Sequence, residues 1–257
     1  MKEMVLVTGA SSGIGMDFAR IFAEKGYNLV LVARSEGKLK SLAKELGKKY
    51  KAEVKIIPKD LSKIAAPKEI FEELRKENIS IDILVNNAGT QVYGNFLETD
   101  LDKEMKMMQV NVNSLVCLTK LAVNQMKEKG KGRILNLAST GAFMPVPLNS
   151  IYCASKAFVL HFSEGIKKDL EGSGITVTTL CPGPTKSKFA KKAQMTNTRL
   201  FSRMMDSRKV AMIGYKALMK GKRGVVPGFS NKLMAISYRF TPRSLLLSIG
   251  KYIMDKK

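Results

Sequence analysis

The chain is poor in the residues on which several common active sites depend. It has one histidine, His161, and three widely spaced cysteines, Cys117, Cys153 and Cys181. We therefore expect neither a histidine-based metal cluster nor a Ser-His triad, and we interpret His161 as an ordinary helix residue. Three cysteines without a paired motif predict no disulfide framework and indicate a reducing compartment. No metal site is predicted.

Long apolar runs are also missing. None approaches the ~20 residues of a membrane-spanning helix. The first residues, MKEMVLVTGA, lack the longer apolar region and the small-residue cleavage site of a signal peptide, so we expect a cytoplasmic protein. The 257 residues, 45% of them hydrophobic and 26% charged, are typical of one substantial soluble domain.

Acidic residues are scarce in the last quarter of the chain. Residues 186–257 hold 18 of the 44 Lys and Arg residues but 2 of the 22 Asp and Glu residues, in a chain of net charge +22. This one-sided charge favours an anionic partner, such as a phosphate-bearing substrate, an acidic carrier protein or an anionic membrane surface. Nucleic acid is not expected, because no aromatic stacking platform or nucleic-acid motif is evident.

What the sequence does contain is a regular alternation of strand and helix patterns up to about residue 184. Uniformly apolar runs, such as MVLVTG, NLVLVAR and IDILVNNAG, alternate with segments of helical spacing, including one long helical stretch over about residues 101–129. Apolar runs without period-two alternation indicate parallel strands covered on both faces. We predict an α/β fold with a single-domain, Rossmann-like doubly wound parallel sheet over residues 1–257. Its ligand crevice is expected at the carboxyl ends of the strands.

After Pro184 the alternation stops. A basic, Met-rich segment of about 186–207 predicts a lid-like insertion, and a basic amphipathic extension covers about 229–257. The extension predicts two short helices separated near Pro242. Its apolar positions are Leu233, Ile236, Phe240, Leu245, Leu246, Ile249 and Ile253. Three interpretations stay open: packing on the body or on a second subunit, attachment to an anionic membrane, or a wall for a large lipid-like substrate.

The first strand is followed by TGASSGIG, residues 8–15. Its glycines permit a tight turn and close backbone approach, and the next helix offers N–H groups to a pyrophosphate. The second strand ends in Ala33-Arg34-Ser35, without the acidic residue that binds a free ribose 2′-hydroxyl. Arg34 can form two hydrogen bonds to a 2′-phosphate and Ser35 can donate another, which favours NADP(H) over NAD(H).

Seven motifs in register resemble the classical short-chain dehydrogenase/reductase family, in its NADP-preferring form, over about residues 3–190. They are TGASSGIG at 8–15, DL at 60–61, NNAG at 86–89, Asn111 in VNVN, Ser139 in NLAS, YCASK at 152–156 and PGPTKS at 182–187. The resemblance implies an NADP(H)-dependent oxidoreductase that interconverts a carbonyl and an alcohol. Dimers or tetramers are usual for the family.

The resemblance also implies a set of cofactor-binding residues. They are Gly9, Ser11, Ser12, Gly13, Ile14, Gly15, Arg34, Ser35, Asp60, Leu61, Asn87, Ala88, Gly89, Tyr152, Lys156, Pro182, Gly183 and Thr185. Within this set Asp60 and Leu61 would border the adenine, and Asn87 the adenosine ribose. Lys156 would hold the nicotinamide ribose, and the segment after Pro182 would close over the nicotinamide end.

The implied catalytic residues are Asn111, Ser139, Tyr152 and Lys156. Tyr152 and Lys156 lie four residues apart, which places them on one face of a helix. A protonated Lys156 and an oxidised nicotinamide would each lower the pKa of the Tyr152 phenol by about 1 to 3 units. Tyr152 would then act as general acid or base, with Ser139 aligning the carbonyl oxygen and Asn111 holding a relay water.

The expected substrate is a small hydrophobic ketone or alcohol. The apolar side chains expected at the substrate face are Phe143, Met144, Val146, Leu148, Phe189, Met195, Met204 and Met205. One alternative is a 3-oxoacyl group on a carrier protein or coenzyme A, because both carriers are acidic or phosphorylated. Another is a non-catalytic dinucleotide sensor or membrane-peripheral interaction protein.

Overall fold

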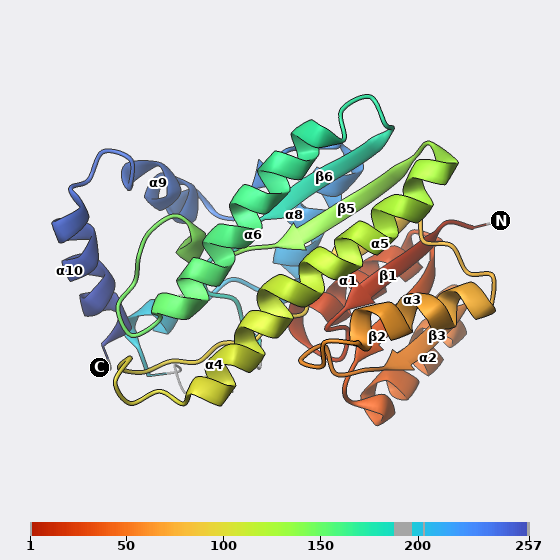
Figure 1. Ribbon diagram of the computed structural model, residues 1–257, viewed down its shortest axis with the longest axis horizontal. Helices are drawn as coiled ribbons and strands as arrows, with labels where there is room; N and C mark the ends of the chain where they lie inside the picture. Colours follow the sequence, from red (N-terminus) through yellow and green to blue (C-terminus); the bar gives the residue numbers. More distant parts are fainter. Residues whose placement is uncertain (1, 188–196, 203, 256–257) are drawn as a thin grey trace.

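The computed structural model describes residues 2–187, 197–202 and 204–255. At its centre is one seven-stranded parallel sheet (Figure 1). The strand order is β3-β2-β1-β4-β5-β6-β7. The strands are β1 Met4–Thr8, β2 Asn28–Ala33, β3 Val54–Pro58, β4 Ile83–Asn86, β5 Gly132–Leu137, β6 Ile175–Leu180 and β7 Gly224–Val225. The helices are α1 Gly13–Glu24, α2 Glu36–Tyr50, α3 Ala66–Lys76, α4 Leu101–Met108, α5 Ser114–Lys129, α6 Ser150–Asp169, α8 Ser207–Met219, α9 Phe229–Ser237 and α10 Arg243–Met254.

Helices cover both faces of the sheet, as β2 illustrates. Leu29 and Leu31 pack into a cluster with α1, α2 and α8, whereas Val30 and Val32 pack into a second cluster with α3 and α5. Each face of the strand therefore meets a helical layer, which explains why every position after Asn28 is apolar. The predicted α/β class and doubly wound parallel sheet are confirmed (Figure 1).

The crevice forms where the direction of chain winding reverses. From β1 the chain builds outward through β2 to β3, then returns to place β4 on the other side of β1. The loops that leave the carboxyl ends of β1 and β4 therefore separate and leave a space between them. The TGASSGIG and NNAG motifs lie at these two strand ends.

The segment 101–129, predicted as one helix, has three parts. Helix α4 ends at Met108, a π-helical turn covers Gln109–Asn113, and α5 begins at Ser114. A π-helical turn widens the helix locally and shifts the direction of the side chains that follow. The predicted site residue Asn111 lies within this turn.

The C-terminal part differs from the body in arrangement. The two helices predicted near Pro242 are present as α9 and α10, and Pro242 stands directly before α10. Much of the predicted lid-like segment 186–207, including Phe189 and Met195, lies outside the described residues. Across the described ranges, no helix combines the length and apolarity needed to cross a bilayer.

Candidate active site

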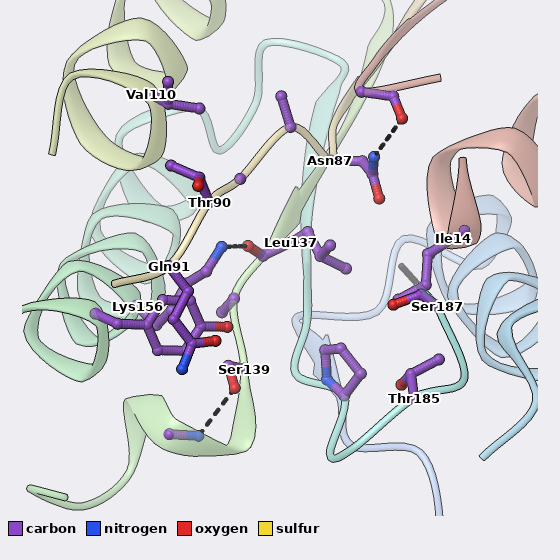
Figure 2. A pocket seen from close by; sticks show the side chains of 18 of the residues that line it. Ile14, Asn87, Thr90, Gln91, Val110, Leu137, Ser139, Lys156, Thr185 and Ser187 are labelled. Carbon is purple, nitrogen blue, oxygen red and sulfur yellow. Dashed lines mark hydrogen bonds between the residues drawn. The ribbon is translucent and has the colours of Figure 1, made fainter. Parts of the chain in front are cut away.

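A cavity of about 740 Å³ opens at the carboxyl ends of the central strands. Its wall contains every predicted site residue except Gly15 and Asn111. The sheet therefore brings together motifs that are distant in the sequence, from the first glycine turn to the segment after β6. Figure 2 shows Ile14, Thr185 and Ser187 across the cavity from Lys156 and Ser139.

The glycine turn leaves the start of α1 open to the cavity. Gly9 and Gly13 adopt positive φ angles of 67° and 57°, which side chains other than glycine disfavour. Ser12, at the N-cap position, forms no side-chain cap, and the first turn of α1 has no acidic residue. The first N–H groups of α1 are therefore available to an anion in the cavity.

Gly15 does not line the cavity, because it packs inside the protein against Asn87 and Gly9. A Cβ atom at Gly15 would collide with the Asn87 amide and would lie 2.6 Å from the carbonyl oxygen of Gly9. Asn87 Nδ2 donates to the carbonyl of Thr8 at 2.8 Å, and the Thr8 hydroxyl accepts from the backbone N–H groups of Asn87 and Ala88. Asn87 thus joins the two loops of the crevice (Figure 2), while its predicted contact with the adenosine ribose stays a prediction.

Positive side chains gather where β2 and β3 end. Arg34, Ser35 and Lys38 line the cavity, together with Lys63 and with Lys59, which also pairs with Glu69 at 2.7 Å. The nearest acidic residue on α2, Glu36, forms an ion pair with Lys40 at 2.7 Å and does not line the cavity. This part of the cavity therefore suits an additional phosphate group. Arg34 and Ser35 were predicted from the sequence, whereas Lys38, Lys59 and Lys63 were not, because they belong to no motif.

Tyr152, Lys156 and Ser139 meet on one side of the cavity. Lys156 Nζ donates to the carbonyl oxygen of Leu137 at 2.8 Å (Figure 2) and lies 5.8 Å from the centre of the Tyr152 ring. Ser139 accepts a hydrogen bond from the backbone N–H of Gly141 at 3.1 Å, which fixes its hydroxyl at the end of β5. The spacing of four residues does place Tyr152 and Lys156 side by side on α6.

Burial controls the protonation of this group in the protein alone. It raises the pKa of the Tyr152 phenol above the ordinary value of 10.0, although a hydrogen bond with Ser139 opposes the shift. It lowers the pKa of the Lys156 ammonium to about 8. Desolvation therefore dominates the pKa of the phenol in the protein alone, and the lowering expected from a protonated Lys156 together with an oxidised nicotinamide stays a prediction.

Asn111 is buried behind the cavity wall. Its Oδ1 accepts from the Thr90 N–H at 2.9 Å, and its Nδ2 donates to the Thr90 carbonyl at 3.0 Å and to the Ser155 hydroxyl at 3.1 Å. The amide thus ties the segment after NNAG to α6, the helix that carries Tyr152 and Lys156. These contacts give it a positioning role, and its predicted water relay stays a prediction.

The cavity is apolar beside Tyr152, where Met144, Val146, Phe201 and Met254 belong to the same packed cluster. Met144 and Val146 line it as expected, but Phe143, Leu148, Met204 and Met205 do not. Further apolar lining comes from Leu200 and Phe201 of the segment predicted as lid-like, and from Met234, Ile253 and Met254 of the C-terminal extension, for which a substrate wall was one of three open interpretations. A polar pair lies beside it, since Gln91 Nε2 donates to Asn149 Oδ1 at 2.8 Å and both residues line the cavity.

His161 lies on the exposed side of α6 and does not line the cavity. No group of three or more His, Cys, Asp or Glu residues suited to a metal ion is found among residues 2–187, 197–202 and 204–255.

The sequence of residues 3–198 matches the family profile described as short chain dehydrogenase. The chain belongs to this family. It is therefore an oxidoreductase that uses a nicotinamide dinucleotide, and the family resemblance of its motifs is confirmed. The alternative of a non-catalytic sensor is set aside.

Proteins named very-long-chain 3-oxoacyl-CoA reductase match this chain over different lengths. The very-long-chain 3-oxoacyl-CoA reductase of Anas platyrhynchos is 33% identical over 256 residues, which cover 96% of this chain and 80% of that protein. The human protein of the same name is 35% identical over 197 residues, or 74% of this chain and 62% of that protein. The chain thus spans less than two thirds of some of these relatives.

Solved structures also resemble most of the chain. A short-chain dehydrogenase from Sphingobium yanoikuyae in complex with NADPH has a TM-score of 0.84 and 30% identity, with 93% of each chain covered. The bulky-bulky ketone specific alcohol dehydrogenase from Comamonas testosteroni has a TM-score of 0.79 and 30% identity, with 90% of each chain covered.

The residues that line the cavity of this short-chain dehydrogenase fit a nicotinamide dinucleotide. The open N-terminus of α1 suits a pyrophosphate, and the positive side chains beyond it suit the phosphate-bearing end of the adenosine. Lys156 has donor capacity beyond its bond to Leu137, because an ammonium group carries three protons.

Proposed function

We propose that this enzyme is an NADPH-dependent reductase of a ketone carried on a long apolar chain, with a 3-oxoacyl thioester as the substrate class. The observation that carries the proposal is the juxtaposition of two surfaces in one cavity. The Ser139, Tyr152 and Lys156 group lines the same cavity as the apolar side chains of Met234, Ile253 and Met254.

The preference for NADPH is supported by charge at the end of β2. Arg34 and Lys38 line the cavity there, and no acidic side chain takes the place of Arg34. A 2′-phosphate would be attracted, whereas the ribose hydroxyls of NADH would lose the carboxylate partner that such sites use. The NADPH complex of the Sphingobium relative agrees with this choice.

The cofactor, when bound, supplies the hydride for reduction. Tyr152 donates its phenolic proton to the substrate oxygen, and the Ser139 hydroxyl donates a hydrogen bond that holds the same oxygen in place. Lys156 orients the cofactor through hydrogen bonds and keeps positive charge beside the phenol. Asn111 fixes the position of α6 through Ser155.

The substrate class is supported by the apolar wall and by the relatives. Side chains of Leu200, Phe201 and Met254 give a thioester's acyl chain a surface to cover, and methionine adapts to chains of different shape. Several relatives 29–36% identical to this chain carry the name very-long-chain 3-oxoacyl-CoA reductase. The basic C-terminal quarter suits the phosphates of coenzyme A or an acidic carrier. Dimers or tetramers and a cytoplasmic location stay predictions.

The test is the fall in NADPH absorbance with 3-oxoacyl thioesters of several chain lengths, bulky ketones and steroids. We expect turnover that favours long-chain thioesters. In Tyr152→Phe, kcat should fall by about 10²–10⁴-fold, because the general acid is lost. Tyr50→Phe, a tyrosine outside the cavity, should keep wild-type activity. Undiminished turnover in Tyr152→Phe would contradict the mechanism, and a preference for bulky ketones would contradict the substrate class.

A further inference from the structure

Helices α9 and α10 lie together at the end of the molecule away from α2 and α3 (Figure 1), and one face of each contacts the body, although no residue of α9 is buried. On α10 the anchor is Leu246, Gly250 and Met254, which are buried. The backbone at Gly250 lies so close to Pro147 that an added Cβ atom would be 3.2 Å from its Cδ. On α9, Tyr238 follows the helix and its ring centre lies 5.9 Å from that of Phe143.

A second apolar face of these helices points to solvent. The α9 stripe consists of Phe229, Leu233 and Ile236 of the helix and of Phe240 in the turn after it, with exposed fractions of 82%, 60%, 57% and 83%. The α10 stripe consists of Leu245, Ile249 and Tyr252, which are also exposed. Both stripes repeat every three or four residues, as one face of a helix requires. Large apolar side chains gathered in this way mark an interaction surface.

The same region is strongly basic. Lys232, Arg239, Arg243 and Lys251 are all exposed, and none forms an ion pair with a described residue. The sequence from 207 to 254 contains no Asp or Glu. A surface that combines exposed aromatic and aliphatic side chains with unneutralised cations fits an occupant that is both apolar and anionic.

A second copy of the chain fits this surface poorly. In a two-fold dimer the same patch meets itself, so these cations would face each other with no carboxylate from residues 207–254 between them. We propose that the stripes and cations of α9 and α10 form a docking surface for an anionic lipid bilayer. Apolar side chains enter the acyl boundary, and the lysines and arginines pair with lipid headgroups.

Docking of this kind would bring the cavity wall to the membrane. Met234 of α9 and Ile253 and Met254 of α10 line the cavity, while neighbouring residues on the same helices form the stripes. An apolar molecule dissolved in the bilayer would then meet the wall without crossing water. The proposal does not depend on which substrate the enzyme reduces.

The experiment is co-sedimentation of the full chain with vesicles of phosphatidylcholine and phosphatidylserine, and with vesicles of phosphatidylcholine alone. We expect binding to the mixed vesicles that weakens with added salt and is at least about tenfold weaker without phosphatidylserine. Leu233→Ser with Ile236→Ser removes half of the α9 stripe and should weaken binding at least about tenfold. The matched control, Ile64→Ser with Leu97→Ser, removes apolar groups that are even more exposed elsewhere on the surface and should bind as wild type.

The charges are tested separately, with folding checked by NADPH binding. A variant with glutamine at Lys232, Arg239, Arg243 and Lys251 should lose at least about tenfold in binding. A second variant, with glutamine at Lys44, Lys48, Lys68 and Lys76, removes the same charge from α2 and α3. It should bind the vesicles as the wild type does. Wild-type chain that stays in the supernatant would overturn the proposal, as would equal losses in the two variants. Stripe variants that bind vesicles normally but lose a dimer in light scattering would assign the surface to a second copy instead.

Discussion

Strand β2 and helix α10 are both rich in apolar residues, yet their side chains have opposite fates. All six residues of β2 are buried, since helices cover both faces of the sheet. In α10, Leu246 is 7% exposed, whereas its neighbours Leu245 and Leu247 are 50% and 43% exposed. An apolar residue is therefore buried only when the fold supplies a neighbour in its direction, and a terminal helix has neighbours on one side.

The same contrast separates the two ends of the cavity. The cofactor end is built from backbone turns and from polar contacts such as those of Asn87 and Thr8, which the central strands fix. The substrate end depends on side chains of α9 and α10, two helices outside the sheet. Changes in the first region should alter cofactor binding, and changes in the second should alter the packing of the substrate wall.

The largest expected effect compares two adjacent leucines of α10. Leu246→Ala should lower the free energy of unfolding by about 2–5 kcal/mol, because it leaves a cavity beside Met144 and Val146. Leu245→Ala makes the same chemical change on the exposed face and should lower it by about 0.5 kcal/mol. Urea unfolding measures both values, and hydrogen exchange of the α10 amides shows whether the loss is local. Equal losses in the free energy of unfolding would mean that both faces of α10 contribute equally to stability.

A smaller effect is expected at the cofactor end. Arg34→Asp replaces a cation at the end of β2 with a carboxylate, which repels a 2′-phosphate and accepts hydrogen bonds from ribose hydroxyls. A charged hydrogen bond contributes about 1.5–3 kcal/mol, so the ratio of kcat/KM for NADPH over NADH should fall about 10- to 100-fold. Arg75→Asp, on α3 outside the cavity, gives the same charge change and should leave the ratio unaltered. An unchanged ratio in Arg34→Asp would remove Arg34 from the cofactor site.

The central part of the fold could be predicted from the sequence because its signals are local. Uniform apolar runs identify buried strands, and a glycine turn followed by a helix identifies an anion site wherever the strand order later places it. These rules placed Gly13 and Arg34 at one cavity without knowledge of the sheet, whereas Tyr152 was added by the family resemblance of its motif.

Other features depend on contacts that no local pattern records. The π-helical turn that carries Asn111 lies inside an otherwise regular helical pattern, and the sequence gives no reason to break it there. Met254 joins the cavity because α10 packs onto the loop that contains Pro147, and Met234 joins it because α9 lies against Gly183 in the segment after β6. In α10, Leu245 and Leu246 looked equivalent in the sequence, and the direction of the body decides which of them is buried.

The smallest expected effect concerns the buried charge of the cofactor end, which has no counterpart among the exposed cations of α9 and α10. Burial lowers the pKa of Lys156 to about 8, so its ammonium form is present below that pH and is lost above it. The pKa of Tyr152 is raised above 10.0, so the phenol keeps its proton through this range. If the ammonium holds the cofactor, the NADPH dissociation constant should rise by up to about tenfold between about pH 7 and about pH 10, with the rise beginning near the pKa. Titration of NADPH fluorescence measures it, and Lys156→Met should bind more weakly with no such rise. A flat wild-type profile would show that the protonation of Lys156 does not contribute to cofactor binding.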